Sequence, residues 1–236
     1  MRQLILDIGL EPEPSFASFV VGHNAPAMQH LQRWATETAQ QQMPLYLWGP
    51  HGAGKTHLLR AARQALSERG ASVGWLDAGA SPQAPFDEGW DAVILDDVQA
   101  YDASLQHAAF RWFVQAMAPA DGTPCAVLAA GQLPPADLPL REDLRTRLAW
   151  GHVFELQPLS EAHGRAALRQ AAEARGLLLS DEVMDYIWTR FSRNLGDLMP
   201  WLERLDRYAL QMRRAITIPL IRAMLEAESD SVEAVF

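Results

Sequence analysis

Gly49-Pro50-His51-Gly52-Ala53-Gly54-Lys55-Thr56 is a glycine-rich stretch between an apolar run, 44–48, and a helical pattern that begins at Thr56 and ends at Gly70. Glycines let successive backbone N–H groups face inward, and the helix directs its positive end at the same point. This arrangement suits phosphate. Lys55 would reach the β- and γ-phosphates and the Thr56 hydroxyl would coordinate Mg²⁺. The stretch, with the adjacent His57, therefore predicts a nucleotide-binding loop.

Further apolar runs with strand character follow the loop, and helical patterns lie between most of them. They cover 72–76, 92–95, 126–129 and 152–156. Strands that alternate with helices indicate a parallel sheet with helices on both faces. We therefore expect an α/β fold with a parallel five-stranded sheet.

Beyond Ser160 the strand patterning ends and only helices are predicted. One runs over 161–175 and closes at Gly176, a second is capped by Ser180, a third spans 196–213, and a short one starts at Pro219 after an apolar segment, 216–218. At the other end, prolines at positions 12 and 14 oppose regular structure. We expect three parts: a tail and linker, 1–14; an α/β subdomain, 15–157; and a small helical lid, 158–236.

The composition is that of a globular protein, with 236 residues and 49% hydrophobic residues. No apolar run approaches the about 18 residues that cross a bilayer, so we expect a cytoplasmic protein without membrane contact. The net charge of −9 opposes non-specific attraction to nucleic acid and favours protein partners. Cys125, the single cysteine, lies in an apolar run, which predicts a buried and inert thiol.

Two carboxylates, Asp96 and Asp97, follow the run 92–95 directly. The carboxyl ends of buried parallel strands are where such sheets bind ligands. Asp96 would hold Mg²⁺ and Asp97 would polarise the attacking water. The alternative is a pair of acidic residues in an ordinary turn, which the phosphate loop upstream makes less attractive.

Arg145 and Arg147 precede the last strand. An arginine near this end of an ATPase sheet can reach the γ-phosphate of a neighbouring subunit. Composition alone would make both residues surface charges, so the residues themselves leave the choice open.

Three segments resemble the AAA+ region of the bacterial replication initiator DnaA: 94–98, the run Arg145-Thr146-Arg147-Leu148-Ala149-Trp150-Gly151, and 214–218. The likeness spans nearly the whole chain after the tail and implies an AAA+ fold. DnaA continues into a DNA-binding helix-turn-helix domain, whereas this sequence ends at Phe236, so we expect a module without that domain. Such a module is similar to the Hda family, the regulators that inactivate DnaA after replication begins.

The tail segment 3–8 is similar to the hexapeptides with which proteins of this kind dock into the sliding clamp, the β subunit of DNA polymerase III. The docking residues implied are Gln3, Leu4, Leu6 and Ile8. An extended peptide with one amide and several apolar side chains suits a hydrophobic groove. DNA would be contacted indirectly, through the clamp. The alternative is a strand that the tail adds to the domain's own sheet.

The resemblance also assigns roles to residues of the α/β part and the lid. Arg147 becomes a finger that acts in trans on ATP held by DnaA, with Arg145 as runner-up. Gly196 stands where DnaA has a nucleotide-contacting arginine, and Gln132 stands where DnaA has an acidic residue. Gln132 can hydrogen-bond but cannot ionise. These departures imply that the chain binds ADP, ATP or another nucleoside diphosphate and hydrolyses it weakly.

Two alternative functions are compatible with the same loop. A DnaA-related helicase loader would hydrolyse its own ATP and bind single-stranded DNA, but it would require a basic, aromatic groove that the acidic composition disfavours. A small-molecule kinase would leave Asp96, Asp97 and Arg147 without their matching roles. The sequence leaves open whether the protein forms a homodimer.

Overall fold

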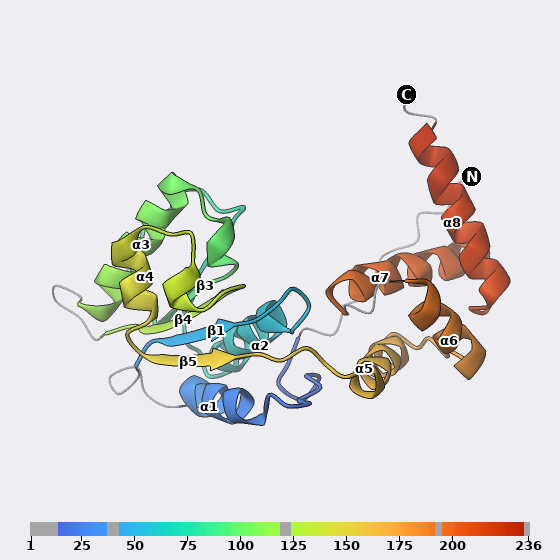
Figure 1. Cartoon of the computed structure of the whole chain (residues 1–236), viewed down its shortest axis with the longest axis horizontal. Helices are drawn as coiled ribbons and strands as arrows, with labels where there is room; N and C mark the ends of the chain where they lie inside the picture. The colour runs from blue at the N-terminus through green and yellow to red at the C-terminus, as the bar shows by residue number, and fades with distance from the viewer. Residues whose placement is uncertain (1–13, 37–42, 119–123, 192–194, 234–236) are drawn as a thin grey trace. The chain divides into compact units, whose positions relative to one another are not determined.

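The computed structural model describes residues 14–36, 43–118, 124–191 and 195–233, which belong to two compact units (Figure 1). The first unit comprises the described residues up to Pro158, and the second those from Leu159 onward. In the described part of the chain, no helix has both the length and the apolarity that a membrane span requires.

The first unit is built on a single sheet of five strands. They are β1 (Leu45–Trp48), β2 (Val73–Leu76), β3 (Ala92–Leu95), β4 (Ala126–Gly131) and β5 (His152–Glu155). Their order is β2-β3-β4-β1-β5, and every neighbouring pair is parallel. In β1, Leu45 is level with Leu128 on one side and His152 on the other. The prediction of a parallel five-stranded sheet is confirmed.

Helices cover both faces of this sheet (Figure 1). They are α1 (Ala25–Thr36), α2 (Lys55–Glu68), α3 (Ala103–Met117) and α4 (Glu142–Leu148), with short 3-10 turns at Val98–Ala100 and Pro135–Asp137. The first two share one hydrophobic core with the sheet, and the last two share the other. This three-layer arrangement follows from parallel connections, which place helices over the faces of a sheet.

The sequence of β4 shows why both faces are covered. Ala126, Leu128 and Ala130 pack in the core of α1 and α2, whereas Val127 and Ala129 pack in the core of α3 and α4. Side chains alternate between faces with a period of two, so a strand that is apolar at every position requires cover on both sides.

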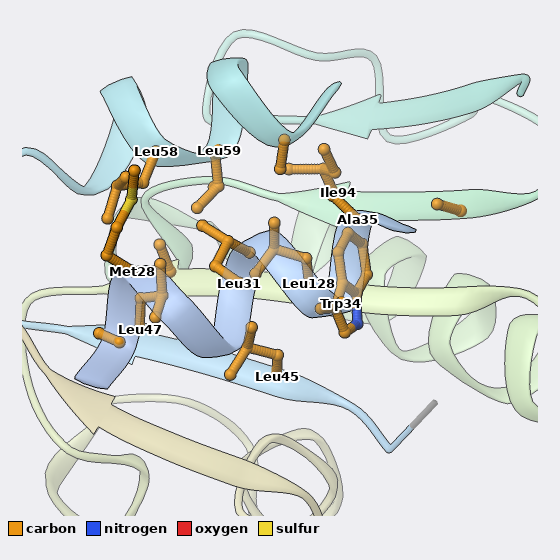
Figure 2. Packing of buried hydrophobic residues seen from close by; sticks show 14 of the residues in the cluster. Met28, Leu31, Trp34, Ala35, Leu45, Leu47, Leu58, Leu59, Ile94 and Leu128 are labelled. Atoms are coloured by element: carbon orange, nitrogen blue, oxygen red, sulfur yellow. The ribbon is translucent and has the colours of Figure 1, made fainter. Parts of the chain in front are cut away.

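Figure 2 shows the first of these cores, where side chains of α1 and α2 meet the sheet. Leu31 of α1 and Leu58 of α2 are completely buried, as is Leu128 of β4. Each such leucine stabilises the fold by about 1.5–3 kcal/mol through burial. The sheet edge that carries the polar site residues is therefore supported by a close-packed scaffold.

The second unit contains only helices in its described part. They are α5 (Glu161–Ala174), α6 (Asp181–Arg190), α7 (Leu195–Met212) and α8 (Ile218–Glu233). Ser160 and Ser180 cap the first two, accepting hydrogen bonds from the amides of His163 and Val183. Gly176, with φ +72°, follows the end of α5. The expected helical lid is confirmed, but its last helix is longer than expected, because Ile221 and Met224 are buried in the lid core and anchor it.

The single cysteine has the environment that the sequence predicts. Cys125 is buried at the start of β4, and its thiol donates to the carbonyl oxygen of Trp90 at 2.9 Å. Burial raises the pKa of the thiol to about 12, so it remains protonated and unreactive at neutral pH.

Candidate functional site

The glycine-rich loop joins the end of β1 to the start of α2. Gly52 and Gly54 have φ values of +77° and +92°, which side-chain-bearing residues rarely adopt. At Gly54 a Cβ atom would also lie 2.6 Å from the Phe19 ring. α2 begins at Lys55, and no described side chain caps its N-terminus. Its first amides therefore point out of the helix end, in the geometry that binds anions.

Lys55 is buried against the loop, with 5% of its surface exposed. Its ammonium donates to the carbonyl oxygens of Gly49 and Pro50, at 2.8 and 3.0 Å. Burial lowers the pKa of Lys55 below its ordinary value, and the carboxylates of Asp97 and Asp96 oppose that shift. The cation is thus held over the loop, where a phosphate would meet it.

Thr56 and Asp96 bring two oxygen ligands together beside the loop. The Thr56 hydroxyl donates to Asp96 Oδ1 at 3.2 Å, and the same oxygen accepts the Asp97 amide at 3.0 Å. Burial raises the pKa of Asp96, and the bond from Thr56 partly offsets this. A hydroxyl and a carboxylate at this spacing fit Mg²⁺, which in phosphate sites takes one or two protein ligands and completes its shell with phosphate and water.

Gln99 connects two residues that the sequence assigned to the site separately. Its side-chain amide donates to Asp97 Oδ1 at 3.1 Å and accepts from the backbone N–H of Gln132 at 2.9 Å. Asp97 itself has φ +51°, an uncommon conformation for a residue with a side chain. Sequence reasoning missed Gln99; the only signal was a polar side chain two positions after the aspartates, at the edge where the strands end.

The segment before α1 also lies against the loop helix, which the sequence analysis did not anticipate. His57 Nε2 lies 3.1 Å from the carbonyl oxygen of Ser15 and 3.2 Å from the Ser18 hydroxyl, and the Phe19 ring packs 5.6 Å from its imidazole. Burial is the main cause of the lowered pKa of His57. An apolar, aromatic segment just upstream of a glycine was the available signal.

A second cluster of functional candidates lies on α3 and α4. The guanidinium carbon of Arg147 is 5.1 Å from the centre of the Phe110 ring, 5.9 Å from Phe113 and 5.8 Å from Trp150. Arg145, also on α4, makes no comparable ring contact among the described residues. The structure therefore distinguishes the two arginines, since only Arg147 is held by aromatic faces.

Two family models match separate parts of the chain. Residues 10–78 match the bacterial DnaA ATPase domain, and residues 161–225 match the lid domain of Hda. The first match covers the nucleotide loop, and the second covers the helical unit from α5 into α8. The chain is an Hda/DnaA-related AAA+ protein. This relationship supports a role in the regulation of replication initiation.

Solved structures show the same fold. Domain III of the Thermotoga maritima replication initiation protein DnaA superposes with a TM-score of 0.73 at 22% identity, over 92% of this chain and 97% of that one. AMPPCP-bound DnaA from Aquifex aeolicus gives 0.68 at 21% identity, over 94% and 71%. A mutant of Thermotoga maritima RuvB gives 0.64 at 15% identity, over 92% and 72%. The AAA+ fold expected from the sequence is confirmed.

The remaining residues singled out in the sequence belong to the helical unit or to the tail. Gly196 is exposed near the start of α7, in the helical unit. The clamp-docking residues of the tail, Gln3, Leu4, Leu6 and Ile8, lie outside the described residues. Their role stays a prediction, as does the finger role of Arg147.

Proposed function

We propose that this protein is a regulatory AAA+ adaptor that stimulates ATP hydrolysis by DnaA and so prevents re-initiation of replication. The observation that carries the proposal is the environment of the Arg147 side chain. Its charge is held by three aromatic rings, and within the described ranges no carboxylate pairs with it. In a DnaA-related AAA+ protein, an arginine whose charge is not paired with a carboxylate in the described part of its own chain is suited to contact the triphosphate bound by another molecule.

The loop site would bind the protein's own nucleotide, ADP or ATP or another nucleoside diphosphate. The loop amides and Lys55 would hold its phosphates. Thr56 and Asp96 would hold Mg²⁺, which neutralises phosphate charge when bound. AMPPCP in the Aquifex aeolicus DnaA structure supports this assignment by analogy of fold.

We further propose that this bound nucleotide is hydrolysed weakly. The acidic and arginine positions of DnaA are occupied here by Gln132 and Gly196, neither of which carries charge. In addition, Gln99 already donates to the Asp97 carboxylate that would polarise a water molecule. Stabilisation of the developing charge is therefore reduced, because catalysis depends on charged groups aimed at the transition state.

In trans, the chemistry would follow from charge compensation. Negative charge on the transferred phosphoryl group is spread over its oxygens, and a guanidinium presents N–H donors that match them. Arg147 would supply this group to ATP bound by DnaA, while DnaA supplies the water and the metal. The protein then acts as an activator of another ATPase.

The tail would bring the protein to newly replicated DNA by docking into the sliding clamp through Gln3, Leu4, Leu6 and Ile8. Such tethering raises the local concentration of the regulator near its target. A pull-down with clamp loaded on DNA tests this role. Gln3→Ala should weaken capture and leave the fold intact; unchanged capture would refute the clamp assignment.

The finger assignment is tested by hydrolysis of DnaA-bound ATP with and without this protein and clamp-loaded DNA. We expect stimulation by the wild type and none by Arg147→Ala. Arg145→Ala is the matched control, since it removes an arginine of the same helix for which the described residues provide no ring contact. If Arg147→Ala stimulates normally, the proposed function is wrong.

A further inference from the structure

The rings around Arg147 come from α3 and from the turn that follows α4, and the backbone of each is held in place. Phe110 and Phe113 lie three residues apart on α3, so they share a helix face, and Phe113 is completely buried. Trp150 follows the end of α4, where its amide donates to the Arg147 carbonyl oxygen at 3.1 Å. A guanidinium within about 6 Å of a ring centre is attracted to the ring face. The arrangement is therefore an aromatic support for one cation.

The turn that carries Trp150 is tied to the sheet. The amide of His152 donates to the Pro44 carbonyl oxygen at 2.8 Å, next to the start of β1. Gly151, which precedes His152, packs so closely on Pro44 that a Cβ atom on Gly151 would clash with the Pro44 backbone. The backbone of Trp150 is thus fixed on both sides, although 60% of the side chain is exposed. Trp150 therefore presents an exposed ring to Arg147 from a backbone that is held in place.

Two other arginines in the described part of the chain bind carboxylates instead. Arg141, also beside Phe110, forms two hydrogen bonds with the Asp143 carboxylate, at 2.8 and 2.6 Å. Arg169 pairs with Asp181 at 2.7 Å. These contacts consume N–H donors, whereas ring faces attract the charge and leave the five donors of Arg147 available.

We propose that Trp150 is a positioning residue for Arg147, and that Phe110 supports the same guanidinium. The inference rests on the proposed function and deepens it. The ring of Trp150, with those of Phe110 and Phe113, holds the guanidinium in one place. Loss of the ring leaves the arginine present but mobile, and misplacement by about 1 Å can reduce a rate by about 10²-fold.

The test is single-turnover hydrolysis of ATP on DnaA, measured over a range of concentrations of this protein with clamp-loaded DNA. Trp150→Ala and Trp150→Leu should lower the maximal stimulated rate about 10- to 100-fold, with little change in the half-saturating concentration. Trp150→Phe should recover most of the rate, because it restores a ring face. Arg63→Ala is the control, since Arg63 lies 5.7 Å from the Trp75 ring and its loss removes a similar pair elsewhere.

The outcomes separate this inference from the proposed function. If Arg147→Ala abolishes stimulation while Trp150→Ala and Trp150→Leu retain the full maximal rate, only the positioning inference is overturned. It is also overturned if leucine restores the rate as well as phenylalanine does, or if the variants change only the half-saturating concentration. If Arg147→Ala itself has no effect, the proposed function fails first.

Discussion

The nucleotide loop and the Arg147 cluster both hold a single cation, and they hold it in opposite ways. Lys55 is buried and donates to two carbonyl oxygens of its own loop. Arg147 is half-buried, and its guanidinium lies against the faces of three rings. One charge is enclosed by polar backbone groups, and the other is supported by apolar groups at the surface.

This difference separates a site that retains a ligand from a group offered to a partner. Backbone carbonyls and nearby aspartates surround Lys55 and compensate its charge. An aromatic support adds attraction without occupying hydrogen-bond donors. The two regions should therefore respond to mutation independently, since Lys55 begins α2 whereas Arg147 lies on α4.

The largest expected effect is that of Arg147→Ala on hydrolysis by DnaA. Loss of an arginine finger reduces a rate by about 10³- to 10⁵-fold. The affinity of the variant for its own nucleotide should stay within about twofold of the wild type, because distant sites act additively. Isothermal titration with ADP measures this affinity, and a large loss would contradict the separation of the two regions.

Lys55→Ala should instead weaken nucleotide binding at the loop. Hydrogen bonds to charged groups contribute about 1.5–3 kcal/mol, so ADP should bind about 10- to 100-fold more weakly. Lys55 is the only lysine in the sequence, and an amine-reactive reagent therefore reports on a single side chain besides the N-terminus. Bound ADP should protect Lys55 from labelling; equal labelling with and without ADP would argue against the loop as the binding site.

Gln99→Leu tests the bridge between Asp97 and Gln132. The variant keeps the apolar part of the side chain and removes both hydrogen bonds. We expect a loss of about 1–3 kcal/mol in the free energy of unfolding, because two hydrogen bonds are lost and each contributes about 0.5–1.5 kcal/mol. Thermal denaturation measures the loss, and Gln83→Leu is a control in an exposed loop. An unchanged melting temperature would show that the bridge is not formed in solution.

Asp96→Asn should stabilise the nucleotide-free protein, by about 0.5–2 kcal/mol at pH 7. The pKa of Asp96 is raised in the folded state, so the folded state binds the Asp96 proton more tightly than the unfolded state does. As pH rises from the ordinary pKa of an aspartate through the raised pKa, Asp96 loses this proton and the folded state loses stability. The gain should therefore shrink toward pH 4. Denaturant unfolding at both values checks this, and a variant less stable at pH 7 would refute it.

The fold was predictable from the sequence because its signals are local. Continuous apolar runs such as 92–95 and 126–129 are typical of strands covered on both faces, and the loop glycines stand at positions with positive φ. Asp96 and Thr56 were likewise predictable, since the end of a strand and the start of a helix meet at one edge of a parallel sheet.

Other features depend on contacts between distant parts of the chain. Phe110 precedes Arg147 by 37 positions, and only the packing of α3 against α4 brings the ring under the guanidinium. The close approach of Phe19 to Gly54 likewise depends on packing between segments that are far apart in the sequence. The length of α8 was underestimated because its polar residues obscure the spacing of Leu220, Ile221 and Met224, which the lid core buries.

The most direct test of the account uses DnaA loaded with ATP that is labelled in the γ-phosphate and freed of excess nucleotide. Phosphate release is then followed after addition of clamp-loaded DNA with the wild-type protein, Asp97→Asn or Arg147→Ala. Because the arginine acts on the ATP of another molecule, Asp97→Asn should stimulate release as well as the wild type, and Arg147→Ala should not stimulate it. The opposite pattern, release that requires Asp97 and proceeds without Arg147, would contradict the account.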